Sequence, residues 1–282
     1  MVSLKKMKTT NLLKALKNLK TVKSFSLRSF YNSSNRINNV GEALEYFVKD
    51  VFCDSLNISS VAGKDKEYSL YLSYRGNANN PPDFIVKGGD AVEVKKIGNS
   101  SSGLALNTSY PKDKLYADSP LITKDCRECE DWSKKDIIYA VGVIKNSVLE
   151  LLWFVYGDCY AADKEIYEKL RQKVINSINS TEDLELSETN ELGHVNKVDP
   201  LGITYFRMRG MWGIENPTKV FDYLDVKKDK KPSIVALMKE EKYNSFPDED
   251  RESLEKMKLV RSVEIKNPNN PAQFLKAKVI EL

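Results

Sequence analysis

A short stretch of the chain, residues 81–96, brings two carboxylates and a lysine into an otherwise apolar setting. Asp83 precedes one apolar run, while Glu93 and Lys95 interrupt a second. Carboxylate oxygens are the ligands that Mg²⁺ prefers, and a lysine beside them can orient a water molecule or take its proton. This combination predicts metal-assisted hydrolysis of a phosphodiester bond. The alternative is the solvated face of an ordinary hairpin, because Asp, Glu and Lys are abundant in this chain.

The same stretch predicts a β-hairpin. Residues 84–86 and 91–94 are largely β-branched and apolar, and a glycine pair lies between them. Side chains alternate along a strand, so Glu93 and Lys95 share one face. Asp83 points to that face only if the turn has three residues, one of them with positive φ, or an equivalent bulge. We therefore predict the three-residue turn, since a two-residue turn would direct Asp83 away.

The predicted site assigns a role to each residue. Asp83, Glu93 and the main-chain carbonyl of Val94 would hold Mg²⁺ against a phosphate oxygen. Two carboxylates that face each other repel, so the arrangement requires a cation between them. Lys95 would orient or deprotonate the attacking water and contact the phosphate, with its pKa lowered by the metal and by burial.

Two further sets of polar side chains suit contacts with DNA. The first follows the hairpin, and the second includes two arginines that share a strand face with Tyr205. Such arginines can each grip O6 and N7 of a guanine, although phosphate clamping or salt bridging would use the same residues. An ordinary surface loop is the alternative for the first set. The predicted DNA contacts are Lys96, Asn107, Ser109, Tyr110, Lys112, Lys114, Arg207 and Arg209.

The elements around the site indicate an α/β fold. Residues 136–144 and 148–156 are nearly continuous apolar runs, which predict neighbouring strands in a sheet covered on both faces. Residues 41–54 and 161–178 have helical periodicity. The predicted architecture is a central mixed β-sheet flanked by helices. We also expect a strand at 68–74, helices at 233–243 and 250–259, and a terminal hairpin built from 261–265 and 274–280.

The 282 residues divide into three predicted regions. Residues 1–37 form a basic N-terminal arm, because Met1 to Gly41 contains nine Lys or Arg and no Asp or Glu. Within it, leucines at positions 12, 13, 16 and 19 lie among lysines and predict a basic amphipathic helix. We expect this arm to lie along DNA phosphates, with a transit peptide, a membrane-surface helix, disorder or a partner helix left open. Residues 38–215 form the nuclease core. Residues 216–282 form a C-terminal extension for dimerisation or for clamping DNA.

Composition excludes several other classes of protein. The single histidine, His194, is too few for sites built on several histidines. The apolar runs are too short to cross a membrane. Cys126 and Cys129 have zinc-knuckle spacing and would need Cys159 and His194 to complete four ligands. Reduced thiols in a cytoplasm are the alternative, and the sequence leaves both open.

The Pro-Asp…Glu-x-Lys arrangement resembles the PD-(D/E)XK nuclease superfamily, and further blocks are similar to the NgoPII-type family of type II restriction endonucleases. The similar blocks are residues 41–46, 81–83, 93–96, 106–111 and 207–212. The similarity runs from about Arg36 to about Pro217. The basic segment before Arg36 does not match the family.

This resemblance implies a PD-(D/E)XK restriction-endonuclease-like core in a Mg²⁺-dependent homodimer of the bacterial or archaeal cytoplasm. It implies cleavage of double-stranded DNA at a short palindrome, GGCC for the type member of the family, beside a cognate DNA methyltransferase that acts on the same site. A helix before the motif often supplies a further acidic ligand in this superfamily. The Gly-x-x-x-Glu spacing assigns that role to Glu45, with Glu42 as runner-up and a plain solvated glutamate as the alternative.

Two other function classes stay open. A nickase or junction resolvase on the same fold would cut one strand or branched DNA only. A DNA-binding protein with an inert site would bind in a salt-sensitive manner without cleaving.

Overall fold

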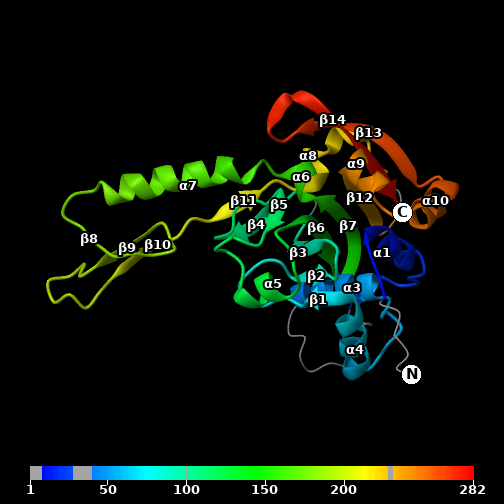
Figure 1. Cartoon of the computed structure of the whole chain (residues 1–282), viewed down its shortest axis with the longest axis horizontal. Helices are drawn as coiled ribbons and strands as arrows, with labels where there is room; N and C mark the ends of the chain where they lie inside the picture. Colours follow the sequence, from blue (N-terminus) through cyan, green and yellow to red (C-terminus); the bar gives the residue numbers. More distant parts are fainter. Residues whose placement is uncertain (1–7, 28–39, 100, 228–230) are drawn as a thin grey trace.

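A mixed β-sheet of nine strands forms the centre of the molecule (Figure 1). The computed structural model describes residues 8–27, 40–99, 101–227 and 231–282. The sheet order is β1 (Leu72–Tyr74), β2 (Phe84–Val86), β3 (Ala91–Ile97), β6 (Lys134–Lys145), β7 (Val148–Tyr156), β12 (Ser233–Lys239), β14 (Asn270–Glu281) and β13 (Val260–Asn267), with β5 (Lys114–Tyr116) paired to β6. The pairs β3–β6 and β7–β12 are parallel. The predicted α/β architecture with a large mixed sheet is confirmed.

The two apolar runs expected in the middle of the sheet are β6 and β7. Almost every residue of β6 is buried, because β3 and β7 flank the strand and helices contact it. Asn146 and Ser147, which join the two strands, both have positive φ. That backbone conformation matches the twist of antiparallel strands that a two-residue turn connects.

Helix α3 (Val40–Cys53) is the predicted amphipathic helix before the hairpin, and it packs on β3 and β6. Its inward-facing residues Leu44, Phe47 and Val48 are fully buried. A Cβ at Gly142 of β6 would lie 2.7 Å from Cδ2 of Leu44, so glycine allows the helix to approach the sheet this closely. This contact sets the distance between α3 and the sheet that carries the hairpin.

Helix α4 (Val61–Tyr71) follows α3 and contacts it. The strand predicted at residues 68–74 is wrong for its first half, because α4 continues to Tyr71 and only β1 is extended. The short remaining elements are α5 (Lys124–Glu128), α6 (Gly157–Tyr160), α8 (Pro217–Val220) and the 3-10 turn η1 (Asp222–Leu224). None of the helices in the described ranges is both long and apolar enough to span a membrane.

The described part of the basic N-terminal segment is packed on the body. Helix α1 (Leu12–Leu19) forms as predicted, but its leucines are buried against α3 and α10 (Asp248–Lys256). Lys17 donates to Asp250 of α10 at 3.0 Å. The leucine stripe therefore belongs to the core of the protein, and the prediction of a separate N-terminal arm is wrong for residues 12–19. Residues 1–7 and 28–37 of that prediction lie outside the described ranges.

Residues 233–281 extend the central sheet. A helix was predicted at 233–243, whereas residues 233–239 form the buried strand β12 and only α9 (Glu240–Asn244) is helical. The run is apolar throughout, and a short run of that kind fits a strand that is covered on both faces. The predicted terminal hairpin is confirmed as β13 and β14.

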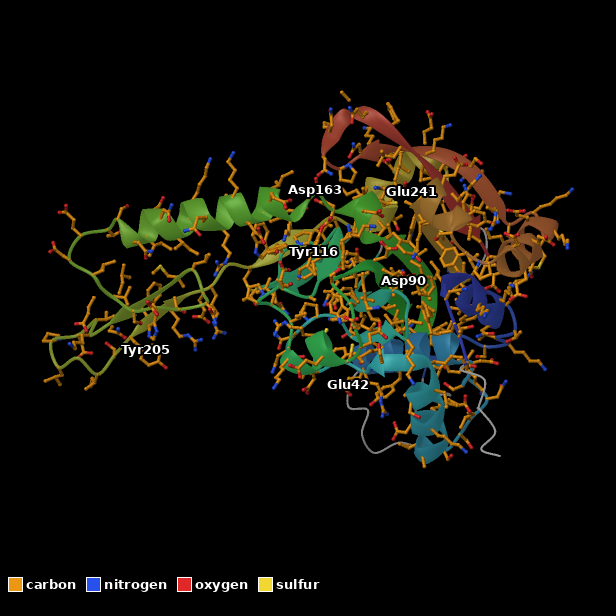
Figure 2. The ribbon with its side chains drawn as sticks, viewed as in Figure 1. Glu42, Asp90, Tyr116, Asp163, Tyr205 and Glu241 are labelled. Atoms are coloured by element: carbon orange, nitrogen blue, oxygen red, sulfur yellow. The ribbon has the colours of Figure 1, made fainter. Side chains whose placement is uncertain are left out.

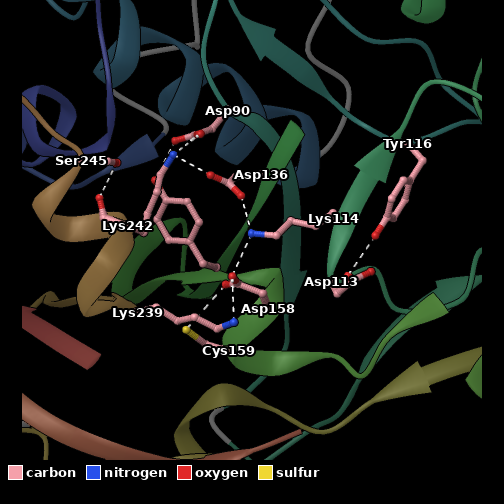
Figure 3. Close-up of polar contacts among 11 residues, drawn as sticks. Asp90, Asp113, Lys114, Tyr116, Asp136, Asp158, Cys159, Lys239, Lys242 and Ser245 are labelled. Carbon is pink, nitrogen blue, oxygen red and sulfur yellow. Dashed lines mark hydrogen bonds and ion pairs between the residues drawn. The ribbon is translucent and has the colours of Figure 1, made fainter. Parts of the chain in front are cut away.

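A series of ion pairs ties α9 to the hairpin (Figure 3). Lys242 of α9 pairs with Asp90 of the hairpin at 2.6 Å and with Asp136 of β6 at 2.7 Å. Lys114 of β5 pairs in turn with Asp136 and, at 2.8 Å, with Asp158 of α6. The C-terminal part of the chain thus contributes both strands and charges to the part that carries the hairpin.

An arm, residues 164–210, projects from the body (Figure 1). One side of the arm is α7 (Lys164–Asn179), and the other is a small sheet of β8 (Glu185–Leu186), β9 (Gly193–Asn196) and β10 (Phe206–Met208). No residue of α7 is buried. The chain returns through β11 (Trp212–Ile214), which pairs with β4 (Leu104–Asn107). The rings of Tyr110, Tyr167 and Trp212 pack together at the base of the arm.

Candidate active site

The hairpin has the three-residue turn that was predicted. Phe84 pairs with Val92 and Ile85 with Ala91, and the N–H of Val86 donates to the carbonyl of Asp90 at 3.0 Å. Residues 87–89 remain as the turn, and one of them, Gly88, has a φ of +62°. This register carries Asp83 to the face of the sheet that holds Glu93.

The side chain of Asp83 is held directly against β3. Its Oδ2 accepts the N–H of Val94 at 2.6 Å. The preceding loop passes over the Asp83 main chain at Gly76, where a Cβ would lie 2.2 Å from the Asp83 carbonyl oxygen and φ is +83°. Only glycine fits that position, so this loop fixes the backbone from which Asp83 projects.

Glu93 and Lys95 form an ion pair on β3, with 2.6 Å between Oε1 and Nζ. Burial alone would lower the pKa of Lys95, but the charge of Glu93 and its hydrogen bond outweigh burial and raise that pKa. The expected lowering of the Lys95 pKa requires the metal as well as burial, because burial does not outweigh Glu93 here. Lys95 is an ammonium ion that neutralises one of the two carboxylates.

The carboxylates of the pocket are crowded and incompletely paired. Burial raises the pKa of Asp83 well above its usual value, and the neighbouring carboxylates of Glu93 and Glu45 raise it further. The hydrogen bond from the Val94 N–H and the charge of Lys95 lower this pKa, but by less. Oε2 of Glu93 is buried and has no hydrogen-bond partner among the described residues. A buried acceptor without a donor, beside a second crowded carboxylate, fits a divalent cation.

Glu45 lies on α3, near Asp83 but in an ion pair of its own. Its Oε1 accepts from Nζ of Lys49 at 2.6 Å, and Lys49 also donates to the carbonyl of Arg75. Across the described ranges, no three His, Cys, Asp or Glu side chains are grouped closely enough to hold one ion. The structure thus brings Asp83 and Glu93 together at Val94 without adding Glu45 to the cluster. Glu42, the runner-up, lies in the first turn of the same helix (Figure 2).

Lys112 adds a second amine to the pocket. Its side chain is buried, its Nζ donates to the hydroxyl of Ser109 and to the carbonyl of Tyr110, and it lies 5.0 Å from the centre of the Tyr110 ring. Burial lowers the pKa of Lys112 to about 8, with Glu93 opposing and Lys95 assisting that shift. The sequence indicated Lys112 only as one of several polar residues, and gave no sign that it would be buried beside the carboxylates.

The other residues predicted to contact DNA do not form one cluster. Lys96 and Asn107 are exposed. The Tyr110 hydroxyl donates to Glu168 at 3.0 Å, which ties Tyr110 to the arm. Lys114 forms ion pairs with Asp136 and Asp158 of the body, and its contact with DNA stays a prediction.

Arg207 and Arg209 lie on the arm. Both form ion pairs with the carboxylate of Glu191. Residues two apart in an extended chain share one face, so the two arginines can reach the same carboxylate. Arg207 is paired across the strands with His194, whose ring packs edge-on against Tyr205. The contact of Glu191 with the two arginines was not predicted from the sequence.

The zinc alternative receives no support within the described residues. Cys126 lies in α5, Cys159 in α6 and His194 in the arm, and all four cysteines are free. The described side chains contain no metal-binding group of three or more such residues. Burial raises the pKa of Cys126 to about 12, so this thiol stays protonated.

Comparison with known proteins gives one family and one curated relative. The model of the NgoPII restriction endonuclease family matches residues 10–269. The type II restriction enzyme NgoPII of Neisseria gonorrhoeae is 43% identical over 274 residues, which are 96% of this chain and 98% of that enzyme. No solved structure matches significantly. The match extends beyond the similarity expected for residues 36–217 at both ends, so the expectation of an unmatched basic leader is wrong from residue 10 onward.

Proposed function

We propose that this chain, which belongs to the NgoPII restriction endonuclease family, cleaves DNA by metal-assisted hydrolysis at Asp83, Glu93 and Lys95. The relative is a type II restriction enzyme, and the chain is accordingly a site-specific deoxyribonuclease whose substrate is double-stranded DNA. The observation that carries the site assignment is the buried Oε2 of Glu93, without a hydrogen-bond partner among the described residues and beside Asp83, whose pKa is raised. We assign the hairpin to the PD-(D/E)XK arrangement on this basis.

Asp83, Glu93 and the carbonyl of Val94 would hold Mg²⁺, and the charge of Glu45 on α3 acts on Asp83. When bound, the ion supplies Lewis-acid stabilisation of the negative charge that develops on the phosphate. Lys95, charged in its pair with Glu93, orients the attacking water and contacts the phosphate. Lys112 adds a second amine near Glu93, and burial lowers its pKa to about 8.

The DNA-binding proposal rests on side chains around the pocket and on the arm. Lys96, Asn107 and Ser109 would contact phosphates, and Arg207 and Arg209 would read base edges. Each active site cuts one strand, so cleavage of a duplex at a palindrome implies a two-fold homodimer. We propose GGCC as the target and a cytoplasmic methyltransferase of the same specificity as the companion enzyme, from the family resemblance alone.

The test of this function is digestion of phage DNA of known sequence with the purified protein and Mg²⁺, followed by mapping of the ends. We expect discrete fragments with one common sequence at every end, and no cutting by Glu93→Gln. Glu130→Gln is the matched control, because Glu130 also pairs with a lysine, Lys135, and accepts the N–H of Gly88 in the hairpin turn, away from the pocket.

Three outcomes would contradict the proposal. Full cutting by Glu93→Gln in Mg²⁺ would remove the site assignment. Nicked but never linear plasmid would indicate single-strand cutting. Salt-sensitive binding without cleavage under any divalent metal would indicate an inert DNA-binding protein.

A further inference from the structure

We propose that Glu191 is a positioning residue that holds Arg207 and Arg209 in place to read guanine bases in the major groove of the target DNA. This inference rests on the proposed function and deepens it. It assigns the reading of DNA sequence to two guanidiniums on the arm and their positioning to one carboxylate.

The three side chains form one connected unit. Nε and Nη2 of Arg207 donate to the two oxygens of Glu191 at 2.8 and 2.6 Å. Nε of Arg209 donates to Oε1 of the same carboxylate at 2.5 Å. The hydrogen bonds from Arg207, and then those from Arg209, hold the pKa of Glu191 below its usual value, so the carboxylate stays ionised. One negative charge shared by two positive ones leaves the unit with a net positive charge, which favours DNA.

Burial within this unit is uneven. The side chain of Glu191 is 16% exposed, whereas those of Arg207 and Arg209 are 46% and 52% exposed. The carboxylate therefore lies beneath the guanidiniums, which face solvent. In the neighbouring ion pair between Glu185 and Lys197, by contrast, both side chains are exposed, at 52% and 65%.

The main chain around Glu191 is anchored from three directions. Arg171 of α7 donates to the carbonyl of Asn190 at 2.6 Å and to that of Glu191 at 3.2 Å. The N–H of Glu191 donates to the hydroxyl of Thr189 at 3.1 Å. The following residue, Leu192, joins the strand ladder through the carbonyl of Met208 at 3.0 Å. These contacts keep the carboxylate at one position relative to β10, which carries Arg207.

The unit leaves the donors needed for base recognition available. A guanidinium has five N–H donors; Glu191 engages two of those of Arg207 and one of those of Arg209. The remaining donors can bond O6 and N7 of guanine. Because the side chains are already ordered, less rotamer entropy is lost on binding. Tyr205, 64% exposed and packed on His194, lies on the same part of the arm (Figure 2).

The experiment compares Glu191→Gln and Glu191→Ala with wild type and with Glu185→Gln, which removes the same charge from the neighbouring ion pair. First, wild-type cleavage of phage DNA defines the target. Then kcat/KM is measured on a short duplex that carries this target and on duplexes in which single G·C pairs are replaced by A·T. Binding to an unrelated duplex is measured over a range of salt concentrations.

We expect the Glu191 variants to lose about tenfold in kcat/KM on the target, mainly through KM, and to discriminate less between G·C and A·T pairs. Binding to unrelated DNA should stay equal or rise, because one negative charge is gone. Glu185→Gln should retain wild-type discrimination. Tighter binding of the Glu191 variants to target and unrelated duplex alike would overturn the proposal, since Glu191 would then merely compete with DNA. Unchanged discrimination would also overturn it. Wild-type protein that cuts no DNA would instead refute the proposed function itself.

Discussion

The hairpin and the arm contain charged clusters of opposite kinds. At the hairpin, two carboxylates and two lysines are largely buried on a nine-stranded sheet, and one glutamate oxygen has no partner among the described residues. On the arm, two half-exposed arginines share one glutamate on a sheet of three short strands. The hairpin cluster buries charges of both signs in a rigid place and leaves one carboxylate oxygen unpaired among the described residues, whereas the arm cluster presents positive charge to solvent.

On the proposed function, this difference corresponds to a division of the two tasks of a restriction enzyme. Hydrolysis requires groups held rigidly around one phosphate, which a buried sheet provides. Base reading requires long, cationic side chains that reach into a groove, which a projecting element provides. The body and the arm should therefore respond differently to substitution, and the following expectations are ordered from the largest effect to the smallest.

Lys95→Met should have the largest effect. The substitution removes the cation that neutralises Glu93 and that we propose contacts the phosphate, so we expect kcat to fall by about a thousandfold, or roughly 4 kcal/mol. DNA binding without metal should change by only a few-fold. Quenched-flow cleavage and a filter-binding assay measure the two quantities separately. An equal loss in both would mean that Lys95 serves only to bind DNA.

Lys242→Met should chiefly lower stability. Lys242 is the cation between Asp90 and Asp136, and its removal leaves these two partly buried aspartates with one partner fewer. We expect the free energy of unfolding to fall by about 2–3 kcal/mol. Urea denaturation followed by circular dichroism checks this value. Lys256→Met, which breaks an exposed ion pair within α10, is the control and should change stability by less than about 0.5 kcal/mol.

The sequence predicted the geometry of the hairpin better than that of its surroundings. The turn could be predicted because only a three-residue loop places Asp83 on the face of Glu93, and β6 and β7 could be predicted because their runs are apolar on both faces. Residues 233–239 were predicted as helix, because a short apolar run fits either state until its neighbours are known. The leucines of α1 suit a core or a surface helix equally, and the lysines around them favoured the wrong interpretation.

Lys112 and Glu191 were not predicted to do what they do because their environments form only in three dimensions. Lys112 is buried near Glu93 by the fold of the chain after β4, and no local pattern marks a lysine for burial. Glu191 meets Arg207 only when β9 pairs with β10. A pairing of this kind between separate segments leaves no periodic signal in one sequence.

Arg207→Lys should have an intermediate effect on recognition. Lysine keeps the charge but loses the planar fork that bonds both oxygens of Glu191 and both acceptors of guanine. We expect discrimination between the target and a single-substituted duplex to fall by about tenfold, with binding to unrelated DNA unchanged. Competition cleavage of the two duplexes measures this ratio. Lys197→Met, on the same small sheet, should leave the ratio unaltered.

The pKa of Lys112 predicts a pH dependence of metal binding. Because burial lowers this pKa to about 8, the amine is charged below pH 8 and opposes a cation near Glu93, and it becomes neutral as the pH rises. The Mg²⁺ concentration for half-maximal cleavage should therefore fall by about threefold to tenfold between pH 7 and pH 9. Lys112→Met should bind Mg²⁺ more tightly at pH 7 and lack this step, while Lys96→Met should keep it. A step that persists in Lys112→Met would assign it to another group.

The smallest effect is expected at the tip of the arm. Leu201 and Ile203 are 80% and 75% exposed, so replacing either with serine removes little apolar surface from the folded state. We expect Ile203→Ser to change the free energy of unfolding by less than about 0.5 kcal/mol. Val155 in β7 is also aliphatic but is fully buried. Val155→Ser should therefore lower the free energy of unfolding several-fold more than Ile203→Ser in the same urea titration. A loss above about 1 kcal/mol for Ile203→Ser would mean that the tip of the arm packs against other residues in solution. The contrast between a buried body and a solvent-exposed arm would then be wrong.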